Sequence, residues 1–372
     1  MRTRGAVIRQ APGRLEVVDL EAGDPYEDEV QVELVASGLC HSDDHHVTGD
    51  IPVGGYPFAL GHEGAGVVTK VRPNSKGIEE GDHVIFSAIP SCGHCRWCAT
   101  GHASLCDLAA GILAGPRFTD GTYRLHTPDG TPVGQMCGIS TFVETTTVSL
   151  ASVVKIGKDI PLDKACLVGC GVSTGWGSAV HSARIEPGDT VIVMGIGGIG
   201  VSAVQGALHA GASQVIAVDP VPFKREQAAV FGATHAVASI EEATELAKQF
   251  TNGQGAAATI VTVGVMRPEY LRQALSSVRK AGTVVTTAVG KHEVSEVPLD
   301  LFELTLSQKR VQGTCFGATN GNWDVLNLLQ LYRDGRLKLD EMITRSYSLE
   351  DIAQGYDDLH EGKNIRGIVR YR

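Results

Sequence analysis

The sequence predicts an α/β protein with two domains, on three observations. The 372 residues are enough for two domains, each with a sizeable core. Up to about residue 157 the chain consists of short β-branched runs separated by glycine and proline, which is typical of strands and turns. From about residue 160 strand-like runs alternate with helical segments, and this alternation predicts a parallel, doubly wound sheet.

The first part is expected to be rich in strands and irregular in outline. Runs of Val, Ile and other strand-forming residues predict strands at 3–8, 29–35, 64–71 and 83–86. Turn pairs such as Pro12-Gly13 and Gly81-Asp82 separate the strands.

The later part has the regular succession of a parallel sheet. Apolar runs predict strands at 190–194, 214–219, 259–263 and 283–287. Helical segments between them are expected at 199–210, 241–250 and 270–278. Beyond residue 316 the pattern predicts an amphipathic helix at 323–333 and a terminal strand at 367–370.

Composition excludes several classes of function. The formal net charge of −10 argues against a nucleic-acid-binding protein. No run of 18 apolar residues exists, so no membrane span is expected, and the N-terminal residues contain no apolar signal core. We therefore expect a cytoplasmic protein, in which nine cysteines favour metal binding or catalysis over disulfides.

Two cysteines and one histidine stand out as ligands of an open metal site. A catalytic zinc takes three thiolate or imidazole ligands and leaves a fourth position for water or substrate. Cys40, His62 and Cys170 are the predicted ligands. They are too far apart in sequence to form a local finger, so the fold has to bring them together. Zinc in such a site lowers the pKa of an alcohol, which makes the alcohol a better hydride donor.

The residues beside these ligands predict a route for the proton that the alcohol loses. Ser42 and His45 form a candidate relay to solvent, by way of a cofactor ribose hydroxyl. Asp43 is expected to orient His62 through its second ring nitrogen, and Glu63 is a carboxylate near the metal that would assist ligand exchange. Without the metal, Ser42 and His45 are equally well explained as ordinary polar residues. The rest of the run is expected to be solvated or structural: His41, Asp44 and His46.

Four cysteines within 15 residues predict a second, closed metal site. Cys92, Cys95, Cys98 and Cys106 have the spacing C-x2-C-x2-C-x7-C and can fill a zinc tetrahedron, so the site would be structural. A redox pair, free buried cysteines and an iron–sulfur cluster are the alternatives. His94 lies between two ligands and is expected at the surface. The other cysteines are expected to be small buried apolar residues: Cys137, Cys166 and Cys315.

A glycine-rich loop predicts a dinucleotide site. Gly195-Ile-Gly197-Gly198-Ile199-Gly200 fits G-x-G-x-x-G, and it follows a predicted strand and opens a predicted helix, where a pyrophosphate binds. Asp219 ends the next strand, and its carboxylate would accept the ribose hydroxyls of NAD and repel the extra phosphate of NADP. Lys224 is expected to add a contact. A βαβ unit without a nucleotide is the alternative.

Taken together, these residues resemble the zinc-dependent medium-chain alcohol dehydrogenases over essentially the whole chain. The motifs that carry the resemblance occur in family order: Gly61-His-Glu-Gly-Ala-Gly66, the four-cysteine segment, Gly169-Cys-Gly171, Ser173-Thr-Gly175 and the glycine-rich loop.

The resemblance implies a fold and a set of cofactors. It implies a GroES-like β-rich catalytic domain at 1–171 that holds two zinc ions, a Rossmann domain at 172–316 that binds NAD, and a return to the catalytic domain at 317–372. Thr174 and Arg366 would lie near the cofactor or the metal. The family also implies a homo-oligomer.

One branch of that family looks most similar. The runs 41–46, 48–52, 111–115 and 362–367 are similar to bacterial alcohol dehydrogenases assayed with a nitrosoaniline dye (NDMA). This resemblance implies a nicotinoprotein, in which NAD stays bound and an external acceptor re-oxidises it in place. His41 stands where many relatives have an arginine that contacts the pyrophosphate, so that contact is in question.

The expected activity is therefore oxidation of a primary alcohol to an aldehyde by hydride transfer to NAD. Two alternatives remain on the sequence. One is a dehydrogenase of alcohols or thiol–formaldehyde adducts that exchanges NAD freely. The other is a non-catalytic zinc- and nucleotide-binding protein, against which the complete ligand set with Ser42 and His45 argues.

Overall fold

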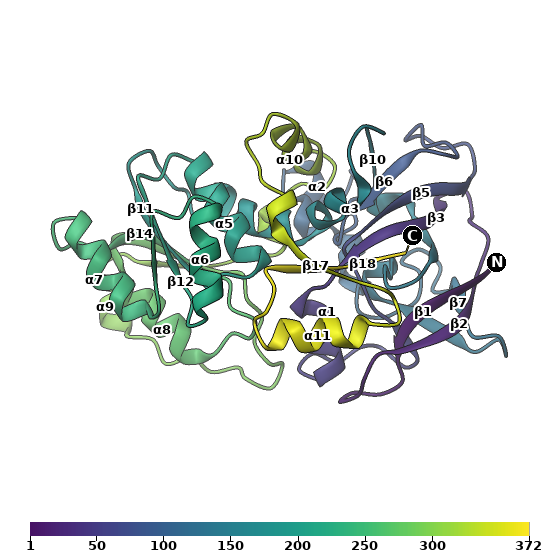
Figure 1. Ribbon diagram of the computed structural model, residues 1–372, viewed down its shortest axis with the longest axis horizontal. Coiled ribbons are helices and arrows are strands. Elements are labelled where there is room, and N and C mark those ends of the chain that lie inside the picture. The colour runs from purple at the N-terminus through teal and green to yellow at the C-terminus, as the bar shows by residue number, and fades with distance from the viewer. Residues whose placement is uncertain (372) are drawn as a thin grey trace. The chain divides into compact units, whose positions relative to one another are not determined.

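A computed structural model describes residues 1–371, which form two compact units (Figure 1). The first unit comprises residues 1–170 and 320–361 and the segment that begins at Arg366. The second comprises residues 171–319 and 362–365. The functional domain boundaries after residues 171 and 316 stay a prediction. Within the described chain, none of the helices combines the length and the apolar character that a membrane crossing requires.

The first unit is built from two β systems. One is a closed barrel, in the order β1 (Arg2–Ile8), β2 (Glu16–Ala22), β7 (Leu125–His126), β8 (Pro132–Gln135) and β4 (Phe58–Ala59). The other is a seven-stranded sheet, in the order β10 (Val153–Ile156), β6 (His83–Phe86), β5 (Gly64–Val71), β3 (Glu29–Gly38), β18 (Arg366–Arg370) and β17 (Ile343–Tyr347), with β9 (Thr145–Ser149) also paired to β3.

Strand β3 organises the first unit. It pairs antiparallel with β5, where Ser37 lies opposite Gly64, and with β18, where Ile368 lies opposite Gly38. The end of β3 therefore lies between β5, which follows His62 in sequence, and β18, which lies near the end of the chain.

The first unit also contains helices. They are α1 (His41–Thr48), α2 (Arg96–Ala99), α3 (Leu162–Ala165), α10 (Asp324–Arg333) and α11 (Ile352–His360). The Tyr356 hydroxyl on α11 donates to the carbonyl of Cys40 at 3.4 Å, just before α1 begins. The sequence analysis missed α1, because its eight residues are polar and carry no apolar periodicity.

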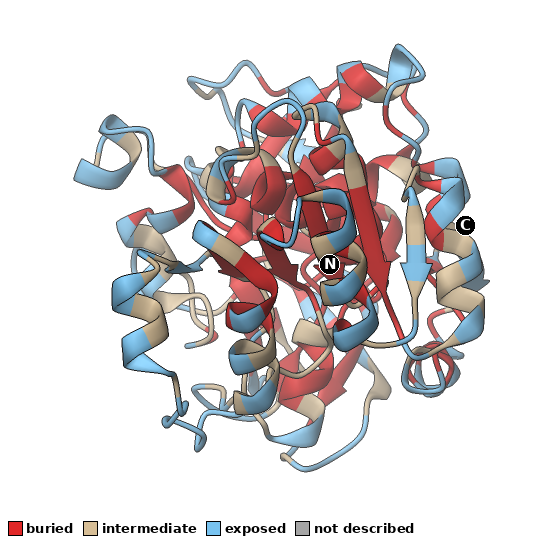
Figure 2. Ribbon diagram, turned by 90° about the vertical axis from the view of Figure 1, so that its left-hand side faces the viewer, coloured by how far each residue is buried: buried red, intermediate tan, exposed pale blue. Residues whose placement is uncertain are grey.

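The second unit has the predicted doubly wound form. Its parallel sheet has the order β13 (His235–Val237), β12 (Gln214–Val218), β11 (Thr190–Met194), β14 (Ala256–Val261), β15 (Val278–Thr286) and β16 (Arg310–Gly313). Its helices are α4 (Gly171–Gly177), α5 (Gly198–His209), α6 (Pro222–Val230), α7 (Ile240–Phe250), α8 (Pro268–Ser277) and α9 (Leu301–Leu306). Figure 2 shows buried central strands and helices with exposed outer faces.

Local sequence explains the main elements of this unit. All five residues of β11 are buried, as expected for a central strand covered on both faces. Helix α7 begins where the Ser239 side chain accepts from the amide of Glu242, an ordinary N-cap. Helices α6 and α8 both begin with a proline, which suits the first turn.

We predict that Val193→Ala destabilises the second unit by about 2 kcal/mol, because it removes two carbons from a fully buried site and leaves a cavity. Val230→Ala, the same change at a side chain that is 38% exposed, should have a much smaller effect. Denaturant unfolding of both variants measures the difference. Equal losses would contradict the assignment of β11 to the core.

Candidate functional site

The predicted ligands of the open metal site meet in the first unit. Ligand atoms of Cys40, His62 and Glu63 lie within 4.8 Å of one another, and all three residues are buried. The side chain of Cys170 lies beside those of Cys40 and His62 and influences their charge. Cys40 follows β3, His62 precedes β5, and Cys170 is the last residue of the first stretch of this unit. Three segments that are distant in sequence therefore converge.

The imidazole of His62 is oriented by its neighbour on α1. Its Nδ1 lies 3.1 Å from Oδ1 of Asp43, which also accepts from the Gly61 amide at 2.8 Å. The other ring nitrogen, Nε2, is buried and has no hydrogen-bond partner, and the same is true of Oδ2 of Asp43. A buried imidazole nitrogen that faces two sulfurs without a partner fits a metal ligand, since such groups are otherwise costly.

The side chains of the cluster shift one another's pKa values. A hydrogen bond from Cys170 lowers the pKa of Cys40 well below its usual range, and the same contact raises the pKa of Cys170. Burial opposes the charged form of His62, but Asp43 and the two sulfurs raise its pKa well above the ordinary value. The pocket thus concentrates negative charge on soft ligands, which is the donor set that zinc prefers.

An ion pair closes one side of the cluster. Arg366, the first residue of β18, donates from Nη2 to Oε2 of Glu63, and both side chains are buried. Burial raises the pKa of Glu63 to about 7, although the guanidinium opposes this shift. Gly38 makes the approach possible, because a Cβ there would lie 2.2 Å from the Glu63 oxygen and 2.8 Å from Nη2 of Arg366. Arg366 therefore faces the predicted metal cluster.

The predicted relay residues lie on α1. Ser42 and His45 are three residues apart and so share a helix face. Oγ of Ser42 lies 3.6 Å from Sγ of Cys40, and His45 is buried with Nδ1 3.4 Å from Oδ2 of Asp50.

The rest of the α1 run holds the helix in place. Asp44 and His46 are buried. Oδ2 of Asp44 lies 2.8 Å from Nε2 of His360 on α11, and Nδ1 of His46 lies 3.0 Å from the carbonyl of Ile51. These two residues are therefore structural and not solvated, while His41 is half-buried. Sequence reasoning missed Asp50 and His360 as partners because each lies outside the ligand motif, and only packing brings them to it.

The four-cysteine segment forms a separate cluster in the first unit. The sulfurs of Cys92, Cys95, Cys98 and Cys106 lie within 4.8 Å of one another. The amides of Cys92 and Cys95 donate to the sulfurs of Cys106 and Cys92, each at 3.3 Å. The amide of Cys98 lowers the pKa of Cys95 to about 6, and burial raises that of Cys106 to about 12. Backbone donors aimed at sulfurs fit a site that holds thiolates.

The cysteines and the histidine outside the two clusters mostly lie where they were expected. His94 is exposed and bonds only locally, 2.9 Å from the carbonyl of Cys92. Cys137 and Cys166 are buried. Cys315 is exposed, so the prediction for it was wrong. It follows β16, an edge strand whose four residues are all exposed.

The glycine-rich loop lies between β11 and α5 in the second unit. Helix α5 begins after Gly197 without a side-chain cap, and a Cβ on Gly197 would meet nothing within 4 Å, so there is open space beside the start of the helix. A Cβ on Gly200 would lie 1.9 Å from the carbonyl oxygen of Gly195, so the tight turn requires glycine. These features fit a pyrophosphate at the helix N-terminus.

The other predicted nucleotide contacts lie in the same unit. Asp219 is buried next to the loop, where its carboxylate accepts from the amides of Ile196 at 2.8 Å and Val221 at 2.9 Å. Lys224 is on α6 and Ile199 is in the first turn of α5. Thr174 is buried in α4, where its carbonyl accepts from the Ser178 hydroxyl.

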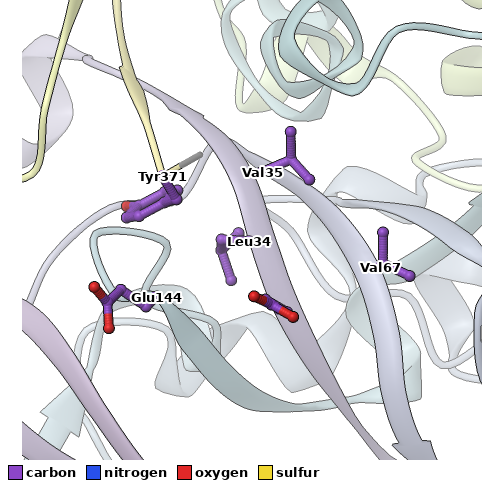
Figure 3. Close-up of a pocket in the computed structure, with 6 residues that line it drawn as sticks. Leu34, Val35, Val67, Glu144 and Tyr371 are labelled. Carbon is purple, nitrogen blue, oxygen red and sulfur yellow. The ribbon is translucent and has the colours of Figure 1, made fainter.

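A cavity of about 150 Å³ lies elsewhere in the first unit (Figure 3). Strands β3 and β5 and two flanking segments line it: Glu33, Leu34, Val35, Val67, Glu144 and Tyr371. None of the predicted site residues is among them, so the cavity has no part in the chemistry described above.

Comparison with known proteins shows which protein families this chain matches. Residues 26–158 match the model of the alcohol dehydrogenase GroES-like domain, and residues 198–331 match that of the zinc-binding dehydrogenases. The chain is 48% identical over 371 residues to the NDMA-dependent alcohol dehydrogenase of Amycolatopsis methanolica, covering 100% of this chain and 99% of that one. It is 47% identical, with the same coverage, to alcohol dehydrogenase B of Mycobacterium tuberculosis.

A solved structure also matches this chain over its whole length. A zinc-binding-domain alcohol dehydrogenase from Burkholderia ambifaria aligns with a TM-score of 0.93 at 32% identity, covering 100% of this chain and 99% of that one. The predicted fold, a GroES-like β-rich domain with a Rossmann domain, is confirmed by these matches.

We predict that Cys98→Ser lowers the bound zinc by about one ion per chain and lowers the melting temperature, because a structural zinc site contributes folding free energy directly. Cys315→Ser, the same change at an exposed cysteine outside both clusters, should leave both quantities unchanged. Metal analysis by atomic emission measures the zinc. Full zinc content in Cys98→Ser would contradict a four-sulfur site.

We predict that Gly200→Ala weakens NAD binding about 10- to 100-fold, because overpacking of about 1–3 kcal/mol falls on the turn that receives the pyrophosphate. Gly313→Ala is the matched control, since a Cβ there meets nothing within 4 Å. Titration of NADH fluorescence gives both affinities. Equal affinities would show that the loop does not contact the nucleotide.

Proposed function

This chain belongs to the zinc-binding alcohol dehydrogenases, and on that premise we propose that it oxidises primary alcohols to aldehydes with an NAD that stays bound and is re-oxidised in place by an external acceptor. Alcohol dehydrogenase activity, zinc and NAD(H) follow from the family. Retention of NAD is supported by the whole-length similarity to a relative named for its dye dependence.

One observation carries the proposed chemistry. The sulfurs of Cys40 and Cys170 and the unpartnered Nε2 of His62 converge on one point. Cys40, His62 and Cys170 would hold the catalytic zinc, which leaves one position of a tetrahedron for the alcohol. When bound, zinc lowers the pKa of the alcohol, and the nicotinamide ring of NAD accepts the hydride.

The side chains around the ligands have distinct roles in this proposal. Ser42, beside the Cys40 sulfur, takes the proton from the alcohol, and His45 on the same face of α1 passes it towards solvent. Asp43 holds His62 with Nε2 towards the metal. Glu63 offers a carboxylate next to the ligands during their exchange, and Arg366 balances its charge.

The second unit supplies the nucleotide site. The glycine loop at 195–200 would receive the pyrophosphate, and Asp219 would select NAD over NADP. Thr174 and Lys224 are proposed as further cofactor contacts. The four-cysteine cluster would hold a second, structural zinc, and the functional domains would divide at 171 and 316.

We predict that Cys40→Ala lowers turnover by about a thousandfold or more, because loss of a ligand removes several kcal/mol of Lewis-acid stabilisation. NAD binding should remain, since the glycine loop is untouched. Alcohol-dependent dye reduction and NADH titration measure the two properties, with Cys315→Ala as the control. An active Cys40→Ala protein would disprove this mechanism.

Retention of NAD has its own test. We predict that denaturing the purified protein releases about one NAD(H) per chain, and that alcohol reduces the dye without added NAD. Chromatography of the released nucleotide measures its amount. A protein free of nucleotide that produces NADH in solution from alcohol and added NAD would favour the freely exchanging dehydrogenase.

A further inference from the structure

His45 lies too deep to deliver a proton to bulk water by itself. The residue is 3% exposed. A relay that ends on a buried imidazole needs another group to receive or stabilise the charge, because a buried cation without a partner is costly. The group that faces His45 is the carboxylate of Asp50, whose Oδ2 lies 3.4 Å from Nδ1.

The chain builds this contact with a turn at the end of α1. The helix ends at Thr48, and Gly49 follows with φ of +82°, a conformation that favours glycine. The turn brings Asp50 back over the last helical residues. The amide of Ile51 donates to the carbonyl of His45 at 3.1 Å, and the carbonyl of Ile51 lies 3.0 Å from Nδ1 of His46. Both contacts anchor Ile51, so the backbone that follows Asp50 is fixed against the end of α1.

The other charged groups near His45 are engaged elsewhere or are more distant. The ring of His41 is 6.5 Å from that of His45, centroid to centroid. The carboxylate of Asp44 lies against His360 on α11. Asp50 is less buried than His45, with 12% of its side chain exposed against 4%, so it is nearer to water.

We propose that Asp50 is a positioning residue for alcohol oxidation, which holds His45 in the protonation state and orientation that the relay needs. This inference rests on the proposed function. By accepting from Nδ1–H, the carboxylate leaves the lone pair on Nε2, the nitrogen that then takes the proton released through Ser42. The carboxylate of Asp50 stabilises the resulting imidazolium. When the imidazolium loses its Nε2 proton to water, the ring returns to the neutral form with its proton on Nδ1.

The first test is Asp50→Asn in the zinc- and NAD-loaded protein. We predict about a tenfold slower first turnover at saturating alcohol and NAD, because an amide cannot balance the imidazolium charge. The solvent deuterium isotope effect should rise, and added imidazole or formate should restore part of the rate, while zinc and NAD content stay unchanged. Asp50→Glu should recover part of the rate without added base.

Matched controls separate positioning from general damage. Asp357→Asn makes the same change at an exposed residue of α11 and should behave as the unaltered protein does. His45→Gln combined with Asp50→Asn should be no slower than His45→Gln alone, because Asp50 acts through His45.

Four outcomes overturn the inference. A first turnover in Asp50→Asn at the unaltered rate, or a loss that added base does not relieve, would remove the role of Asp50. Losses that multiply in the double variant would show that Asp50 does not act through His45. An unaltered protein that oxidises no alcohol would instead overturn the proposed function, and this inference with it.

Discussion

The convergence of Cys40, His62 and Cys170 is the constraint on which the rest of the first unit depends. Burying sulfurs, an imidazole and an ion pair together costs several kcal/mol per charge unless each group finds a partner. Asp43 supplies the partner for one side of His62, and Arg366 supplies that for Glu63. Three buried atoms of the cluster are left without a hydrogen-bond partner: Oδ2 of Asp43, Nε2 of His62 and Nε of Arg366. The imidazole nitrogen among them points to a cation as the missing component.

The strand order shows how the fold meets this constraint. Strand β3 lies between β5 and β18, so its end meets both the His62-Glu63 segment and Arg366. Helix α1 then begins directly after Cys40 and places Ser42, Asp43 and His45 over the cluster. Helix α11 secures α1 through Tyr356 and His360. The C-terminal segment is therefore as necessary to the metal cluster as the ligand motifs themselves.

In the second unit, the parallel sheet positions the loop that is predicted to bind the nucleotide. A parallel sheet covered by helices places the β11–α5 turn at the carboxyl end of a central strand, where helix amides are available to a phosphate. The buried carboxylate of Asp219 is tied to the loop by the Ile196 amide, so loop and carboxylate form one rigid element. The fit of this unit to a nucleotide rests on backbone geometry.

The sequence by itself determined the fold class and the alternating elements of the second unit, and it predicted two sets of candidate metal ligands, because periodicity, glycine spacing and ligand chemistry can be read from residue types. It did not predict α1, whose polar residues carry no apolar period, or the exposure of Cys315, which follows from the edge position of β16. Nor did it indicate that Asp50 faces His45 or that His360 pairs with Asp44. Only the tertiary structure decided these contacts, since they depend on a turn after α1 and on the return of the chain end, and neither leaves a repeating signal in the sequence.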